Sequence, residues 1–184
     1  MSMIGDRLLT EIIVEHKIFD PAEILKVVNI SLRKELGEGD KKTMDGMDIA
    51  LCRIQFEKDK STEIVFAGAK RPIYFHKKDS GTIDLVECDH KSIGGFSSAK
   101  EISFTNKVIK ATSGDMIFFF SDGIIDQQNF ERNRFGSKKF ESIILENINS
   151  PLNVMKDKIE TTFKKFMVEE EQRDDITVIG IKLN

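Results

Sequence analysis

The sequence predicts an α+β fold in which antiparallel sheet is flanked by helices, and three observations lead to this class. Along the 184 residues, two helical patterns come first, then several strand patterns, then two more helices and a last strand. A grouped order of this kind favours antiparallel strands with segregated helices. The composition, 40% apolar and 32% charged, is that of a globular chain, and the length suits one hydrophobic core. We therefore expect residues 1–184 to form a single domain.

Two helices are expected before the first strand. Residues 1–16 repeat apolar side chains at helical spacing, with no capping residue before them. Either the chain begins inside a longer domain, or this is a true N-terminus on a mobile first turn. The second helix has a clearer start, because Asp20 stands at the N-cap position, Pro21 at the first helical position and Glu23 at the capping-box position. A polar, glycine-containing loop at 37–42 ends it.

The middle of the chain changes to strand patterns separated by polar turns. We expect strands at residues 49–56, 63–67, 73–76, 82–87, 101–104 and 116–120. Apolar residues at helical spacing then predict helices at 137–147 and 151–166. A final strand is expected at 176–183.

Charge, hydropathy and cysteine content exclude several classes of protein. The formal net charge of −3 gives no support for a nucleic-acid partner. The longest apolar run, at 116–120, is far too short to cross a bilayer, and the first residues lack the order of a signal peptide. Cys52 and Cys88 are the only cysteines, so neither a disulfide framework nor a cysteine zinc site is expected. These features indicate a soluble, cytoplasmic chain with no membrane segment.

Acidic residues stand at the ends of two predicted strands. Asp122 follows the apolar run 116–120 and precedes Gly123, while Asp174 and Asp175 precede the final strand. If these strands are neighbours, Asp122 and Asp174 converge at one edge of the sheet. Converging carboxylates repel each other unless a cation lies between them, and Mg²⁺ or Mn²⁺ prefers oxygen ligands. The alternative is that Asp122 makes an ordinary turn and the other two aspartates are solvated.

The order of these motifs resembles a known family. Residues 114–123 (GDMIFFFSDG) resemble a segment in which Gly-Asp, an apolar run and [Ser/Thr]-Asp-Gly follow one another, and residues 173–178 (RDDITV) are similar to a closing Asp-Asp-[Ile/Met]-Thr motif. Residues 66–72 resemble an Ala-Gly-x-x-Pro loop, and residues 92–94 resemble the loop that follows it in the same family. Residues 1–5 resemble the helix that follows a Gly-His-Gly turn. These are features of the SpoIIE/RsbU-like PPM phosphatases, bacterial metal-dependent protein serine/threonine phosphatases.

The resemblance implies a PPM-phosphatase-like α-β-β-α sandwich of antiparallel sheets, incomplete at its N-terminus. It implies Asp122 and Asp174 as catalytic metal ligands, Gly123 as the residue that leaves space at the site, and two Mn²⁺ or Mg²⁺ ions in the intact domain. The family has two more aspartates and two more strands upstream of the helix that residues 1–5 resemble. We therefore expect this chain to be the C-terminal major part of the domain, with weak or no activity of its own.

Several further expectations follow. The resemblance implies a phosphorylated partner protein of the anti-sigma-factor-antagonist type. An open sheet edge predicts homodimerisation or poor solubility, unless a helix covers that edge. The alternatives are a non-catalytic pseudo-phosphatase that binds a regulatory partner, and an unrelated α/β sandwich with purely structural strand ends. Asp45 and Asp48 are explained by a turn and a strand start, and residues 70–71 (Lys-Arg) either steer a phosphate or form a solvated loop pair.

Overall fold

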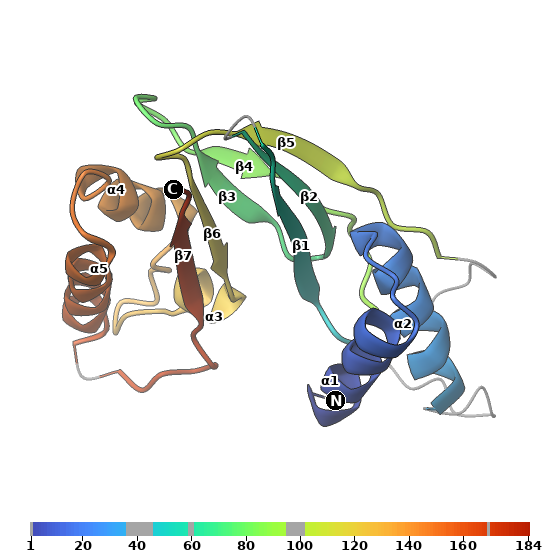
Figure 1. Ribbon diagram of the computed structural model, residues 1–184. Helices are drawn as coiled ribbons and strands as arrows, with labels where there is room; N and C mark the ends of the chain where they lie inside the picture. Colours follow the sequence, from blue (N-terminus) through green and yellow to red (C-terminus); the bar gives the residue numbers. More distant parts are fainter. Residues whose placement is uncertain (1, 36–45, 59–60, 95–101, 169) are drawn as a thin grey trace. The chain divides into compact units, whose positions relative to one another are not determined.

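The computed structural model describes residues 2–35, 46–58, 61–94, 102–168 and 170–184. The chain forms two compact units (Figure 1), which comprise Met1–Pro72 with Val86–Ser113, and Ile73–Leu85 with Gly114–Asn184. Each unit combines helices with antiparallel strands, so the predicted α+β class is confirmed. The single domain over residues 1–184 stays a prediction.

The first unit packs two helices against a three-stranded sheet. Its elements are α1 (Ser2–Thr10), the π-helical turn η1 (Glu11–Glu15), α2 (Pro21–Glu35), β1 (Ile49–Phe56), β2 (Thr62–Ala69) and β5 (Lys107–Ala111), with the strand order β1-β2-β5. The apolar face of α2 supplies Leu25 and Val28, both fully buried, to a core that also contains Ala67 and Ala69 of β2. The helical periodicity of the sequence thus identified the face that covers the sheet.

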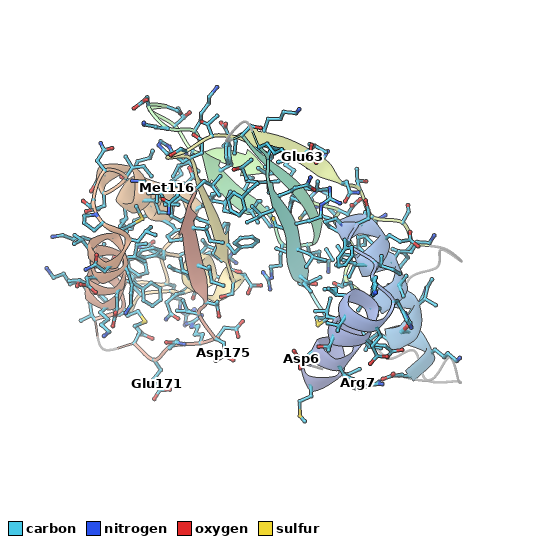
Figure 2. All side chains as sticks on the ribbon, viewed as in Figure 1. Asp6, Arg7, Glu63, Met116, Glu171 and Asp175 are labelled. Atoms are coloured by element: carbon cyan, nitrogen blue, oxygen red, sulfur yellow. The ribbon has the colours of Figure 1, made fainter. Side chains whose placement is uncertain are left out.

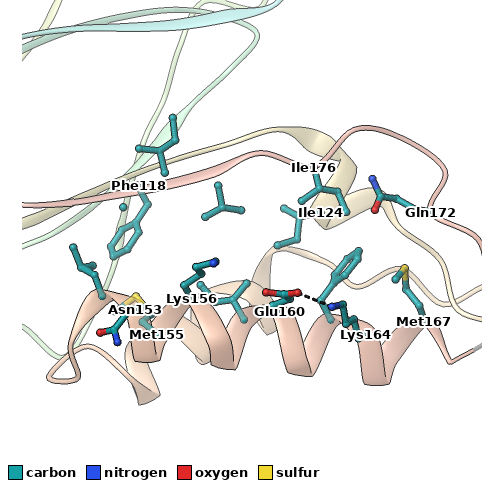
Figure 3. Close-up of a pocket in the computed structure, with 16 residues that line it drawn as sticks. Phe118, Ile124, Asn153, Met155, Lys156, Glu160, Lys164, Met167, Gln172 and Ile176 are labelled. Carbon is teal, nitrogen blue, oxygen red and sulfur yellow. Dashed lines mark hydrogen bonds and ion pairs between the residues drawn. The ribbon is translucent and has the colours of Figure 1, made fainter.

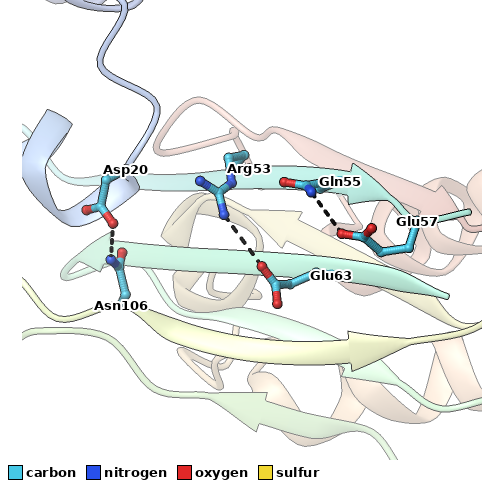
Figure 4. A network of polar contacts seen from close by, with 6 residues as sticks. All are labelled: Asp20, Arg53, Gln55, Glu57, Glu63 and Asn106. Atoms are coloured by element: carbon cyan, nitrogen blue, oxygen red, sulfur yellow. Dashed lines mark hydrogen bonds and ion pairs between the residues drawn. The ribbon is translucent and has the colours of Figure 1, made fainter.

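The start of α2 has the predicted cap. The Oδ1 atom of Asp20 accepts the backbone N–H of Glu23 at 2.9 Å. Its Oδ2 atom accepts the side-chain amide of Asn106 at 2.6 Å, as Figure 4 shows beside the Arg53–Glu63 contact of the sheet. Asn106 in turn accepts the backbone N–H of Ala22 at 3.0 Å, so this cap joins α2 to the segment that enters β5.

The second unit packs helices against a four-stranded sheet. Its elements are β3 (Ile73–His76), β4 (Asp84–Val86), β6 (Met116–Phe120), β7 (Val178–Lys182), α3 (Asp122–Asp126), α4 (Ser137–Glu146) and α5 (Leu152–Met167), with the strand order β4-β3-β6-β7. Its core is aromatic, because Tyr74 stacks on Phe120 at 4.6 Å between ring centroids and Phe140 meets Phe120 edge-on at 5.5 Å. β7 ends the strand order, so its outer side is a sheet edge within the described residues.

Several predicted strands differ from those observed. The strand predicted at 101–104 is wrong for 102–104, which belong to no strand, because Ile102 and Phe104 are instead buried in the core beneath α1 and α2. The strand that pairs with β2 is β5, which the sequence analysis missed. β2 continues to Ala69, two residues into the predicted loop. The predicted strands at 82–87 and 176–183 shorten to β4 and β7, and the loop at 37–42 lies outside the described residues.

The helices agree more closely with prediction. The helix expected at 1–16 is present, but η1 interrupts its regular winding. The two helices predicted after β6 are α4 and α5, which lie where their apolar spacing placed them. A short helix, α3, starts directly at Asp122 and was not predicted. None of the helices in the described ranges is long and apolar enough to cross a membrane.

Candidate metal centre

β6 and β7 are neighbouring antiparallel strands, which confirms the condition on which the predicted site depends. Their register pairs Phe120 with Val178, and Met116 with Lys182. Because the strands run in opposite directions, the end of β6 and the start of β7 meet at the same edge of the sheet. Asp122, just after β6, and Asp174, just before β7, are therefore carried by adjoining segments.

Ser121 clamps these two segments together. Its hydroxyl donates to the backbone oxygen of Asp175 at 2.9 Å and accepts the backbone N–H of Thr177 at 2.9 Å. The backbone N–H of Ser121 also donates to the oxygen of Thr177 at 3.0 Å. The N–H of Thr177 is therefore bonded to a side chain while its oxygen is bonded to the backbone, and β7 begins at Val178, later than predicted. The residue before Asp122 thus fixes the residues after Asp174.

Gly123 brings the same segments into close backbone contact. A Cβ atom at this position would lie 2.5 Å from the backbone oxygen of Asp175, well inside van der Waals contact. Gly123 was expected to leave space at a bound ligand, whereas the structure shows the Asp175 carbonyl beside it. A role for Gly123 at a bound cation stays a prediction.

Asp174 lies on an exposed segment without helix or strand, shown between the labelled residues Glu171 and Asp175 in Figure 2. Its Oδ1 atom accepts the backbone N–H of Asp175 at 2.7 Å. The side-chain amide of Gln172 donates to the backbone oxygen of Asp174 at 2.8 Å. The segment is therefore ordered by side-chain hydrogen bonds instead of a sheet ladder.

Gln127 is a residue that the sequence analysis missed. Its side chain is 1% exposed, and its amide bonds to the backbone of Glu171 and Arg173, on the approach to Asp174. A polar residue after a short apolar stretch carries no periodic signal, so nothing in the sequence distinguished it from a solvated glutamine.

The donor set fits a hard divalent cation in kind but is incomplete. Asp122 and Asp174 offer only carboxylate oxygens, the ligands that Mg²⁺ and Mn²⁺ prefer. Across the described part of the chain, however, no three His, Cys, Asp or Glu side chains gather where they could hold a metal ion. These residues can therefore supply part of a metal site.

Other candidates from the sequence have local partners. Asp48 accepts the hydroxyl of Ser92 at 2.6 Å and pairs with Arg71 at 3.7 Å, which supports the structural interpretation of Asp48. Asp45 lies outside the described residues. Phosphate steering by Lys70 and Arg71 stays a prediction.

A groove of about 670 Å³ lies between α5 and β7 (Figure 3). Apolar side chains form most of its lining, among them Phe118, Met155 and Ile159, and the Glu160–Lys164 ion pair lies beside them. Asp122 and Asp174 are not among the described residues that line it.

Comparisons with known proteins identify the family and the fold. The family model of stage II sporulation protein E (SpoIIE) matches residues 3–184. A search of curated protein sequences found no match. Among solved structures, the SiaA-PP2C domain of Pseudomonas aeruginosa is 22% identical with a TM-score of 0.81, over 100% of this chain and 69% of that one.

Two further solved structures share the fold. The phosphatase domain of the Bacillus subtilis cell-fate determinant SpoIIE is 18% identical with a TM-score of 0.57, over 98% of this chain and 73% of that one. The catalytic domain of the serine/threonine phosphatase PstP, in complex with two manganese ions, is 16% identical with a TM-score of 0.57, over 100% of this chain and 80% of that one. The predicted PPM-phosphatase-like fold is confirmed by these matches.

Proposed function

The chain belongs to the SpoIIE family of serine/threonine protein phosphatases, and we propose that it hydrolyses phosphoserine and phosphothreonine monoesters on a partner protein. One observation carries this proposal. Ser121 and Gly123 bring the segments of Asp122 and Asp174 into direct backbone contact at one edge of a rigid sheet. Two ligands of a shared cation need adjoining segments of this kind, so the contact supports the proposal.

In this proposal Asp122 and Asp174 are metal ligands and charge neutralisers, and the cation is Mn²⁺ or Mg²⁺. Asp122 and Asp174 would hold such cations, which would lower the pKa of a water so that it could act as a nucleophile at neutral pH, and would neutralise charge on the phosphoryl oxygens. Ser121 holds the backbone that carries both carboxylates, and Gly123 keeps that backbone close. The related PstP domain was solved with two manganese ions, which supports the choice of metal.

Residues 1–184 alone should bind the metal weakly. Two carboxylates neutralise only half of the charge that the expected set of four would neutralise. With no third ligand side chain gathered in the described ranges, we expect millimolar-class affinity and negligible turnover.

The absence of a third ligand side chain in the described ranges also supports a second candidate function. A SpoIIE-type fold with an incomplete donor set suits a non-catalytic domain that binds a regulatory partner. In either case the partner that we propose is a phosphorylated, cytoplasmic regulatory protein of the anti-sigma-factor-antagonist type, on the basis of the resemblance alone.

Calorimetric titration of Mn²⁺ into residues 1–184 tests the proposal. Asp122→Ala should abolish the binding heat and leave the circular dichroism spectrum unchanged. The matched control is Asp126→Ala, which removes an exposed carboxylate of the same helix that pairs with Arg134 at 2.9 Å, and it should bind Mn²⁺ like the parent. Binding that survives in Asp122→Ala would contradict the assigned site, and the absence of any binding heat would favour the non-catalytic function.

A further inference from the structure

The segment that carries Asp174 has no regular secondary structure of its own. Residues 170–177 belong to no helix or strand, although β7 begins directly after them. Two hydrogen bonds to Ser121 hold the C-terminal side of Asp174. Something else must hold its N-terminal side, because a carboxylate on an unrestrained loop cannot keep a ligand geometry.

The amide of Gln127 holds that side with both of its ends. Its Nε2 atom donates to the backbone oxygen of Glu171 at 3.0 Å, and its Oε1 atom accepts the backbone N–H of Arg173 at 3.1 Å. The Nε2 atom also donates to the oxygen of Gln128 at 3.0 Å. The amide therefore bridges the end of α3 and residues 171–173, which lead to Asp174.

Burial makes this bridge specific. Gln127 is 1% exposed, so water cannot replace the bonds that its amide makes. Beside it, the Nη1 atom of the exposed Arg173 donates to the Oε1 atom of the partly exposed Gln128 at 2.7 Å. The residue immediately before Asp174 is thus held at its backbone by Gln127 and at its side chain by Gln128.

We propose that Gln127 is a positioning residue that fixes Asp174 relative to Asp122 and so sets the affinity of this pair for a divalent cation. The inference rests on the proposed function, because it presupposes that both carboxylates bind the same ion. Gln127 itself does not touch the ion. It acts through the backbone of Glu171 and Arg173, whereas Ser121 acts from the other side.

A titration with Mg²⁺ alone, followed by the backbone amide resonances of Gly123 and Asp175, measures this affinity in the millimolar range. Gln127→Met keeps the size of the side chain and removes its hydrogen bonds. It should weaken Mg²⁺ binding by about tenfold, which corresponds to ~1.4 kcal/mol. If Gln127→Met does not fold, Gln128→Met, at a partly exposed position, removes only the contact to Arg173 and should still weaken binding measurably.

The matched control is a buried amide in the other compact unit. Asn29 is 2% exposed, and its Oδ1 atom accepts the backbone N–H of Gly94 at 2.9 Å. Asn29→Leu should lower the melting temperature and leave the Mg²⁺ affinity unchanged. A general loss of stability would lower the Mg²⁺ affinity of Gln127→Met and Asn29→Leu alike. Equal weakening of Mg²⁺ binding in Asn29→Leu therefore overturns the positioning role.

The two proposals fail in different ways. If the resonances of Gly123 and Asp175 do not respond to Mg²⁺ in the parent chain, the proposed metal site itself is wrong. If they respond, and the affinity of Gln127→Met, or of Gln128→Met where Gln127→Met does not fold, equals that of the parent, only the positioning role is overturned.

Discussion

The α-carbon of Gly123 faces the backbone oxygen of Asp175 so closely that any side chain between them must displace one segment. A Cβ atom at Gly123 would lie 2.5 Å from that oxygen and 3.1 Å from the carbonyl carbon of Asp175. The backbone conformation of Gly123 is not the reason for glycine, since its φ angle is not among the positive ones. Glycine is required here for space, at the point where the two candidate ligand segments touch.

Gly123→Ala should therefore separate the two segments. We expect a loss of about 1–3 kcal/mol in the free energy of unfolding, as for overpacking of a well-packed contact. Mn²⁺ binding should also weaken relative to the parent chain, because displacement of Asp175 moves the adjoining Asp174. Urea denaturation and calorimetric titration measure the two effects.

Gly81→Ala is the matched control for that substitution. Nothing lies within 4 Å of a Cβ atom at Gly81, so this change should leave both stability and metal binding near the parent values. If Gly123→Ala and Gly81→Ala have the same free energy of unfolding and the same Mn²⁺ affinity, the close contact between Gly123 and Asp175 contributes to neither.

Ser121→Ala removes the hydroxyl that ties Asp175 to Thr177. The substitution removes two exposed hydrogen bonds, one to the N–H of Thr177 and one to the oxygen of Asp175, which should cost about 0.5–1.5 kcal/mol. Ser142→Ala, which removes an exposed hydroxyl that donates to Glu146 at 2.8 Å, should change stability by less than about 0.5 kcal/mol. Urea denaturation followed by tyrosine fluorescence compares them, and an equal effect of both would count against the clamp.

Asp20→Ala tests the cap in the first unit. The loss of the bond to the N–H of Glu23 should destabilise the protein by about 0.5–2 kcal/mol. Asp20→Ser retains a capping oxygen and should recover part of this loss, although it cannot also reach Asn106. Thermal denaturation by circular dichroism gives both values, and a serine variant no better than alanine would assign the effect to Asn106 instead.

How far the sequence predicted the structure depends on the range of the interaction. The cap at Asp20 and the apolar faces of α2, α4 and α5 were correct, because they depend on residues a few positions apart. β5 was missed, because Lys107 and Lys110 interrupt any apolar alternation in this mostly exposed segment, and only its pairing with the distant β2 defines it as a strand. Ile102 and Phe104 were read as a strand since burial in a loop gives the same apolar pattern.

The candidate site divides in the same way. Asp122 and Asp174 were identifiable because each stands at the end of an apolar strand, and the structure confirms that these strands are neighbours. Their role as metal ligands stays a prediction. Gln127 was not identifiable, because its importance arises only from the return of the chain, more than forty residues later, to its side-chain amide.

Tyr74 allows a test of the second core by pH. It is the chain's only tyrosine, and there is no tryptophan, so the near-ultraviolet absorbance of tyrosinate reports this residue alone. Its ring is 2% exposed and its hydroxyl donates to the carboxylate of Glu141 at 2.8 Å. Burial first, then the hydrogen bond to Glu141 and the negative charge of that carboxylate, raise the pKa of Tyr74 above its ordinary value of 10.0.

A raised pKa in the folded state means that folding favours the neutral phenol. The resulting contribution to stability is fully present below the ordinary pKa of 10.0 and is lost as the pH rises above it toward the folded-state value. We therefore expect tyrosinate to appear above pH 10.0, in one cooperative step together with the loss of circular dichroism. Glu141→Gln keeps a hydrogen-bond acceptor and removes the charge, so it should move the onset toward lower pH. Ionisation centred on pH 10.0 without unfolding would show that Tyr74 is solvated, and the stacked core of Tyr74, Phe120 and Phe140 would then be wrong.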